Sequence, residues 1–286
     1  MPQIFIRRRN IRPYVEAIES SGLTKEYGDT TAVDGLDLSV SKGTVYGLLG
    51  PNGSGKTTTM RMLTTLTKPT NGEAYIMGDS VENREAVIEH IGYLSEESPL
   101  YDELTAREQL EYIADLRDVP EETAQERIED FLSRFGLSDD ADDRISTYSK
   151  GMRRKTSITQ TLLHDPDVVF FDEPTSGLDP RAARTVRELV KELSDRDMTI
   201  LVSTHILPVI EEVADTVGVL YDGVLVAEGE TDELKQRADS GSLEDVFLEV
   251  TTDSDIGMGV DADMEGDRED EKNTDDADDA DDGHGA

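Results

Sequence analysis

The sequence contains no cysteine and no tryptophan, and aromatic residues make up only 5% of its 286 residues. The absence of cysteine excludes disulfides, thiolate metal sites and a cysteine nucleophile. The sequence also lacks an apolar run of the ~18–20 residues that a membrane-spanning helix requires, and its start lacks the apolar region of a secretory signal. We therefore expect a soluble, intracellular protein, long enough for one large domain or two small ones.

Basic residues are scarce as well. The chain has 28 Lys and Arg against 64 Asp and Glu, a formal net charge of −36, and only nine of the basic residues are lysine. The acidic excess extends over the body of the chain, and an acidic surface poor in lysine is similar to that of proteins from salt-accumulating halophiles. We therefore expect a halophilic archaeal source, with an acidic protein of a mesophile as the alternative. In a halophile, overall acidity says little about nucleic-acid partners.

The two ends of the chain differ in charge. Residues 1–13 carry four arginines and no acidic residue. This predicts a solvated basic extension or translation from an upstream start codon; a patch for anionic lipid head groups is the alternative. Residues 251–286 hold 15 acidic and two basic residues, and we expect a disordered tail there because such a segment cannot bury apolar surface.

From Tyr14 onwards, apolar segments predict strands that alternate with helices. The pair Asp222-Gly223 predicts a tight hairpin turn. Between residues 105 and 163 the strand signal stops, and two apolar stripes at helical spacing predict an inserted helical region. The pattern favours an α/β fold with a mostly parallel sheet. The expected strands cover residues 36–40, 45–49, 91–94, 168–171, 199–202, 217–221 and 224–227.

A glycine-rich segment lies between the strand expected at residues 45–49 and a helix expected at Thr58–Leu66. It fits the pattern G-x-x-x-x-G-K-[ST] in full. In this context the glycines let backbone N–H groups turn inward around phosphate oxygens, and the helix N-terminus adds positive potential. Lys56 would reach the β- and γ-phosphates of a nucleotide, and Thr57 would bind Mg²⁺. A glycine-rich turn without a ligand is the alternative. The expected nucleotide-binding residues are Gly50, Pro51, Asn52, Gly53, Ser54, Gly55, Lys56, Thr57 and Thr58.

Two carboxylates, Asp172 and Glu173, end the strand expected at residues 168–171. In a P-loop protein, Asp172 would hold Mg²⁺ directly or through water. Glu173 would orient and deprotonate the water that attacks the γ-phosphate. Alone, such a pair is usually a solvated loop, but the P-loop in the same chain favours the catalytic interpretation.

Three further segments carry a family resemblance. Residues 148–152 (Tyr-Ser-Lys-Gly-Met) precede an expected helix, and residues 174–179 (Pro-Thr-Ser-Gly-Leu-Asp) follow the acidic pair. His205 follows the strand expected at residues 199–202 and the pair Ser203-Thr204 that extends it. Together with the P-loop, in this order and spacing, they make the sequence resemble the ATP-binding subunit of ABC transporters over residues 14 to about 235.

This resemblance implies an architecture and a division of the chain. The fold would be a P-loop NTPase core with a mostly parallel sheet, an antiparallel β subdomain and an inserted α-helical subdomain at about residues 97–158. Residues 14–235 would form the ATPase domain, followed by a short element at 236–250. Two such subunits would dimerise head to tail, as a homodimer or a heterodimer.

The resemblance also implies roles for single residues. Ser149 and Gly151 would contact the γ-phosphate of ATP bound by the partner subunit, whereas His205 would contact the γ-phosphate in its own subunit. Tyr27 would stack on the adenine, a contact that reads the base weakly. Asp179 would cross the dimer interface; it is also a candidate helix N-cap with proline following it.

Two positions depart from the commonest pattern of this family. The signature segment is often L-S-G-G-Q, whereas here it is Y-S-K-G-M, so Lys150 adds a cation near the partner's phosphate. The glutamine expected after residues 92–95 is replaced by Glu96, whose carboxylate can still ligate Mg²⁺. Both variants, and the segment Ser242–Leu248, look like the export-type branch of the family.

The expected function is therefore ATP hydrolysis that energises a separate membrane permease, at the cytoplasmic face of the cell membrane. ATP and Mg²⁺ would be the cofactors, a permease and a second ATPase subunit the partners, and no nucleic acid is expected. A soluble ABC ATPase acting on nucleic acid, ribosomes or cofactor assembly is one alternative, and a P-loop kinase or GTPase is another. The expected catalytic residues are Lys56, Glu173 and His205, and the expected metal ligands are Thr57, Asp172 and Glu96.

Overall fold

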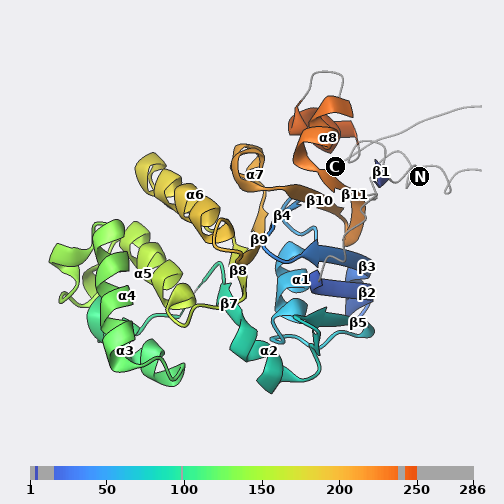
Figure 1. The fold of residues 1–286 in the computed structure, drawn as a ribbon. Coiled ribbons are helices and arrows are strands. Elements are labelled where there is room, and N and C mark those ends of the chain that lie inside the picture. The colour runs from blue at the N-terminus through green and yellow to red at the C-terminus, as the bar shows by residue number, and fades with distance from the viewer. Residues whose placement is uncertain (1–3, 6–15, 98, 238–241, 250–286) are drawn as a thin grey trace, which may run out of the picture.

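The computed structural model describes residues 4–5, 16–97, 99–237 and 242–249. These residues form a seven-stranded sheet, a smaller four-stranded sheet and a separate group of helices (Figure 1). The seven-stranded sheet has, in spatial order, β1 (Ile4–Phe5), β11 (Val224–Glu230), β10 (Thr216–Tyr221), β4 (Val45–Leu49), β9 (Thr199–Thr204), β8 (Val168–Asp172) and β7 (Ile91–Leu94). The four-stranded sheet has the order β3 (Thr30–Ser41), β2 (Glu16–Tyr27), β5 (Asn71–Ile76) and β6 (Asp79–Ser80).

The central strands of the large sheet are parallel. β10, β4, β9, β8 and β7 pair in parallel, and only the β10–β11 hairpin is antiparallel among the long strands. Every residue of β4, β8 and β9 is buried. In β8, Val169 and Phe171 face one hydrophobic cluster and Val168 and Phe170 face the other. The sheet is therefore covered on both faces, which is why its strands read as continuous apolar runs.

Helices cover the two faces differently. α1 (Lys56–Leu63) lies between the sheets, because it contacts β8 on one side and β3 and β5 on the other. α6 and α7 pack on the opposite face (Figure 1). The described helices besides α1 are α2 (Arg84–His90), α3 (Ala106–Leu116), α4 (Glu121–Arg134), η1 (Ser138–Asp140), η2 (Ile145–Thr147), α5 (Lys150–Leu162), α6 (Pro180–Ser194), α7 (Leu207–Val213) and α8 (Thr231–Arg237).

The inserted helical region forms its own lobe. α3, α4 and α5 pack against one another at one side of the molecule, while the antiparallel sheet lies at the other (Figure 1). α5 returns to the core, where its packing on β7 is tight. A Cβ atom added at Gly92 of β7 would lie 2.4 Å from the carbonyl oxygen of Thr161 in α5, so only glycine permits this approach.

The predicted fold class is confirmed: a P-loop-type core with a mostly parallel sheet, an antiparallel sheet and inserted helices. The expected strands all form, and the Asp222-Gly223 turn has both residues at positive φ, 47° and 80°. The helix predicted at Thr58–Leu66 is misplaced. It begins at Lys56 and ends at Leu63, because Thr64 leaves helical geometry and Thr65 has φ 63°.

The chain ends are described only in part. Within the predicted basic extension, Ile4 and Phe5 pair in parallel with Ala227 and Glu228 of β11. The rest of that extension, and the predicted tail at 251–286, lie outside the described residues. Among the helices that the structure describes, none combines the length and the apolar character needed to cross a membrane.

Candidate functional site

The P-loop joins β4 to α1, and its glycines are required by its geometry. A Cβ atom at Gly50 would lie 2.2 Å from the carbonyl oxygen of Leu220. Gly55 has φ 103°, and a Cβ atom there would lie 2.4 Å from the carbonyl oxygen of Ala32. Gly55 is also the N-cap of α1, so no side chain caps this helix, and its first turn has no acidic residue. The first N–H groups of α1 thus remain available to an anion.

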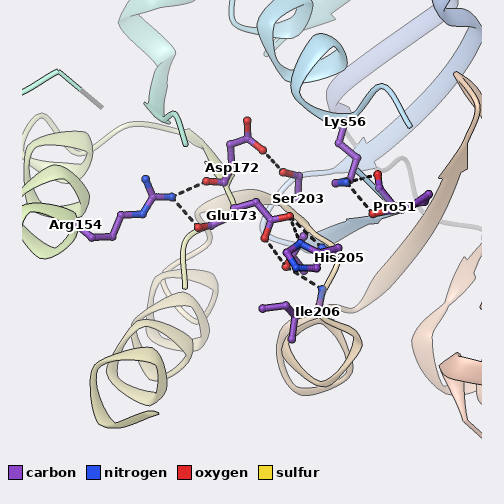
Figure 2. Close-up of polar contacts among 10 residues, drawn as sticks. Pro51, Lys56, Arg154, Asp172, Glu173, Ser203, His205 and Ile206 are labelled. Carbon is purple, nitrogen blue, oxygen red and sulfur yellow. Dashed lines mark hydrogen bonds and ion pairs between the residues drawn. The ribbon is translucent and has the colours of Figure 1, made fainter. Parts of the chain in front are cut away.

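Lys56 is folded into the loop. Its Nζ donates hydrogen bonds to the carbonyl oxygens of Gly50 (2.7 Å) and Pro51 (2.9 Å), as Figure 2 shows. Burial lowers the pKa of Lys56, while the negative charges of Glu173, Asp172 and Glu96 act in the opposite direction. The ammonium therefore lies within the field of all three carboxylates that the sequence assigned to catalysis and metal binding.

Asp172 ends β8 with only half of its carboxylate satisfied. Ser203 of β9 donates a hydrogen bond from its hydroxyl to Oδ1, whereas buried Oδ2 has no partner among the described residues. A buried carboxylate oxygen without a partner is costly. Because carboxylate oxygens are the ligands that Mg²⁺ prefers, Oδ2 fits the predicted role of a metal ligand.

The carboxylate of Glu173, which follows β8, is held by residues at the end of the neighbouring strand β9. Its Oε2 accepts a hydrogen bond from the Thr204 hydroxyl (2.9 Å). Its Oε1 accepts from the backbone N–H of His205 (3.0 Å) and lies 2.8 Å from His205 Nδ1. Glu173 has φ 49°, a left-handed conformation that is rare for a residue with a side chain and that turns its carboxylate from β8 towards β9. The carboxylate is nearly buried while the imidazole is half exposed.

The remaining P-loop and metal candidates surround this centre. Thr57 and Thr58 lie half-buried in the first turn of α1, and Asn52 and Gly53 lie exposed at the tip of the loop. The hydroxyl of Ser54 is buried without a partner among the described residues. Glu96 follows β7 and has an exposed side chain. No direct contact between Glu96 and Thr57 or Asp172 supports a common metal site, so its ligand role stays a prediction.

The signature residues lie at the start of α5. Ser149 is the N-cap, and its hydroxyl accepts a hydrogen bond from the N–H of Met152 (3.2 Å). Gly151 lies in the first turn, where an added Cβ atom would have 3.8 Å to its nearest neighbour. Within the described part of the chain, the hydrogen bonds of Ser149 stay inside its own helix. The chain's own P-loop and its signature segment are therefore not joined by these residues.

Two further predicted residues have structural partners. Tyr27 ends β2 with 49% of its surface exposed, and Lys25 Nζ lies 5.0 Å from its ring centroid. Asp179 caps α6 by accepting hydrogen bonds from the N–H groups of Ala182 (3.0 Å) and Arg181 (2.9 Å). These N–H groups, that of Ala182 most strongly, hold the pKa of Asp179 below its usual value. The N-cap prediction for Asp179 is confirmed.

Three residues at this site escaped the sequence analysis. Ser203 and Thr204 hold the two carboxylates, and Arg154 of α5 donates hydrogen bonds to main-chain oxygens beside them. The sequence places Ser203 and Thr204 just after the strand expected at 199–202, but nothing in it indicates that their hydroxyls bond to the two carboxylates. A basic residue on the buried side of an amphipathic helix is the one signal that pointed to Arg154.

The site and the fold have counterparts among known proteins. A family model described as "ABC transporter" matches residues 33–176. The daunorubicin/doxorubicin resistance ATP-binding protein DrrA of Streptomyces peucetius is 42% identical over 235 residues, which cover 82% of this chain and 71% of that protein. The bacitracin transport ATP-binding protein BcrA of Bacillus licheniformis is 39% identical over 222 residues, 77% of this chain and 72% of that one.

A solved structure agrees with these matches. The chain is similar to an ATP-binding subunit of an ABC transporter, with a TM-score of 0.77 and 29% identity over 82% of this chain and 99% of that chain. None of these findings bears on the halophilic archaeal source that the charge predicts, which stays a prediction. The sequence matches and the shared fold agree with the P-loop geometry, and the chain therefore belongs to the ABC transporter family, as one of its ATP-binding proteins.

Proposed function

We propose that this chain hydrolyses ATP to drive a separate membrane permease, and that the pair works as an exporter. The observation that carries the proposal is that Lys56, Asp172 and Glu173 gather beyond the carboxyl ends of β4 and β8, two parallel strands that flank β9. Similarity to the ATP-binding proteins of drug resistance and bacitracin transport supports the export direction. The chain would act at the cytoplasmic face of the cell membrane.

The phosphates of ATP would lie at the N-terminus of α1. The free N–H groups there and the Lys56 ammonium would bind them, after Nζ leaves the carbonyl oxygens of Gly50 and Pro51. Thr57 and Asp172 would hold Mg²⁺, with Glu96 as a third candidate ligand. When bound, Mg²⁺ neutralises phosphate charge and orients the terminal phosphate for in-line attack.

Glu173 would act as the general base. Its carboxylate is fixed by three donors, so it is aligned to take a proton from a water beside the γ-phosphate. A carboxylate can only accept hydrogen bonds, so Nδ1 of His205 carries the proton in this pair. His205 Nε2 would then face the γ-phosphate, and Tyr27 would cover the adenine.

A second ATPase subunit would complete the site. Ser149 and Gly151 lie at the start of α5, where Ser149 is exposed. In a head-to-tail dimer they would contact the γ-phosphate held by the other subunit, which would be a second copy or a related chain. The alternative of a soluble ABC ATPase acting on nucleic acid, ribosomes or cofactor assembly is not favoured, because the named relatives are ATP-binding proteins of drug resistance and bacitracin transport.

The test of hydrolysis is Glu173→Gln, which keeps the shape of the side chain but removes the base. Turnover is expected to fall by ~10²–10⁴-fold, the usual weight of general base catalysis. Binding of ATP should persist, and ATP should shift the variant from monomer to dimer on a sizing column. Glu188→Gln, on the exposed side of α6, is the matched control and should turn over like wild type. Wild-type turnover in Glu173→Gln would contradict the proposal.

The permease is tested separately. An adjacent reading frame with about six apolar segments of ~20 residues is the expected partner. Coexpression should bring this chain to the membrane fraction with that partner, and its ATP turnover should then respond to the partner. A chain that stays away from the membrane fraction when the partner is present would contradict the transport role while leaving ATP hydrolysis intact.

A further inference from the structure

Arg154 is a buried cation in the middle of α5. Arg154 is 7% exposed, and it donates five hydrogen bonds to main-chain carbonyl oxygens. Burial lowers the pKa of Arg154, and the charges of Asp172, Glu96 and Glu173 oppose that effect. A buried guanidinium is costly unless its donors are satisfied. Here the five hydrogen bonds to carbonyl oxygens satisfy the donors of the buried guanidinium.

The guanidinium joins two segments that end neighbouring strands. Nη1 donates to the carbonyl oxygens of Ser95 (2.6 Å) and Glu96 (3.1 Å), which follow β7. Nη2 donates to those of Asp172 (2.6 Å) and Glu173 (2.8 Å), at the end of β8, as Figure 2 shows for the latter pair. Each terminal nitrogen thus holds one segment, a geometry that the planar fork of arginine permits.

These bonds hold the backbone and do not involve the carboxylate oxygens of Asp172 and Glu173. Glu173 keeps its own partners, Thr204 and His205, while Arg154 fixes the position of its main chain. The long bond from Nε to the Pro174 carbonyl oxygen (3.4 Å) extends the same hold one residue further. Arg154 therefore fixes the main chain from which the Glu173 side chain extends. It does not occupy the carboxylate oxygens that water or a metal would bind.

Arg154 belongs to the helix that the signature segment begins. Arg154 is five residues after Ser149, about 7.5 Å along the helix axis at 1.5 Å per residue. The later part of α5 packs closely on β7, where Gly92 contacts Thr161. A shift at the start of α5 therefore reaches the ends of β7 and β8 through a short, rigid path.

We propose that Arg154 is a positioning residue for ATP hydrolysis, which ties the signature helix to the main chain of Glu96 and Glu173 so that the base is aligned only when α5 is seated. This inference rests on the proposed function. It assigns a role in coupling to a residue whose hydrogen bonds go to main-chain oxygens. An arginine suits this role because its planar fork directs a separate nitrogen at each segment, whereas a lysine would have to reach both from one nitrogen.

The test compares Arg154→Lys, which keeps the charge, with Arg154→Gln, which removes it. Turnover at saturating ATP, KM for ATP and the melting temperature are measured for each. We expect kcat to fall at least tenfold in both variants, with KM within threefold of wild type. Arg154→Lys should recover most of the melting temperature lost in Arg154→Gln but not the turnover. That split separates positioning from support of the fold.

Arg134→Gln is the matched control. Arg134 also bridges the helical insert and the core, through two hydrogen bonds to Glu192 on α6. Unlike Arg154, it bonds to neither segment that carries Glu96 or Glu173. Its kcat should stay within twofold of wild type. The same variants placed in the Glu173→Gln background report binding without hydrolysis, and a fluorescent ATP analogue should bind each monomer as tightly as the parent.

Two results would overturn the inference while the proposed function stands. One is a kcat of Arg154→Lys within threefold of wild type. The other is a loss of turnover that follows the loss of folded protein in both variants. A wild-type chain without ATP turnover would overturn the proposed function itself, and this inference with it, so the two failures are distinguishable.

Discussion

The N-termini of α1 and α5 face phosphate in the proposed dimer, but they are built differently. α1 is capped by Gly55, which offers no side chain, and its first residue is the cation Lys56. α5 is capped by Ser149, whose hydroxyl already accepts from the N–H of Met152. The first helix end is incomplete without an anion, whereas the second satisfies one of its own donors. In the proposed dimer, α1 would therefore bind the phosphates of its own subunit's nucleotide, and α5 would make the weaker contact to the partner's nucleotide.

The largest effect is expected from a substitution at the N-terminus of α1. Lys56→Ala removes the point charge at the phosphate site, and ATP binding and turnover should both fall below detection. Nucleotide binding measured by equilibrium dialysis and phosphate release measured in parallel would check this. Lys191 on α6 is an exposed lysine that pairs with Glu212 on α7. Its variant Lys191→Ala should behave like wild type. Unchanged turnover in Lys56→Ala would refute the P-loop assignment.

The next effect comes from the α5 side. Ser149→Arg added to Glu173→Gln should block the ATP-driven dimer, because a bulky side chain fills the space meant for the partner's phosphate. Binding of ATP to the chain's own P-loop should persist, which reverses the pattern of Lys56→Ala. Light scattering with and without ATP distinguishes the two. An ATP-dependent dimer in the double variant would show that α5 does not face the partner's nucleotide.

A third prediction extends the comparison from helix ends to the whole surface. The acidic excess should destabilise the fold at low ionic strength, where the Debye length is ~30 Å at 0.01 M, and molar salt should screen it. The melting midpoint should rise steadily from 0.1 to 3 M KCl. Deleting residues 251–286, which lie outside the described part of the chain, should leave ATP turnover largely intact. A flat or falling midpoint would argue against adaptation to salt.

The smallest effect concerns a third helix end. Asp179 caps α6 with a carboxylate, which satisfies two N–H groups and disfavours a phosphate there. Asp179→Ala should lower the melting temperature by ~2–4 °C, the usual range for loss of one such interaction in a domain of this size. ATP binding to the monomer should not change.

The same residue has a pH signature. Its backbone hydrogen bonds lower the folded-state pKa of Asp179, so the stability it adds is fully present above the unfolded value near ~4 and is lost as the pH falls through the folded value. The melting temperatures of wild type and Asp179→Asn should therefore differ above pH ~4 and converge as the pH falls through the lowered folded-state pKa of Asp179. A difference that is constant with pH would show that the charge contributes nothing to the cap.

Much of this molecule was readable from its sequence, for physical reasons. The strands of the large sheet are buried on both faces, so residues such as Val168–Phe171 form apolar runs that predict them directly. The P-loop was readable because only glycine fits at Gly50 and Gly55. β2 and β5 were missed, since an antiparallel sheet with one solvated face contains many polar residues.

The parts that were not readable depend on long-range contacts to the main chain. Arg154 bonds to carbonyl oxygens, which every residue has, so no pattern of side chains marks its partners. The roles of Glu96, Tyr27 and Ser149 remain predictions, because each depends on a ligand or a second subunit. The end of α1 was misjudged because Thr65 adopts positive φ, which sequence periodicity does not indicate.

The hairpin turn at Asp222-Gly223 has a consequence for the cost of binding. The N–H of Gly223 donates to the carbonyl oxygen of Ser54 (3.0 Å), and the carbonyl oxygen of Gly223 accepts from Asp34 (2.9 Å). The turn therefore fastens the P-loop to both sheets before any nucleotide arrives. Ordering a free backbone costs roughly 1–2 kcal/mol per residue, so a loop that is already fastened avoids most of that loss. Phosphate binding then has to rearrange little beyond one lysine side chain, and the loop can exchange ADP for ATP without refolding.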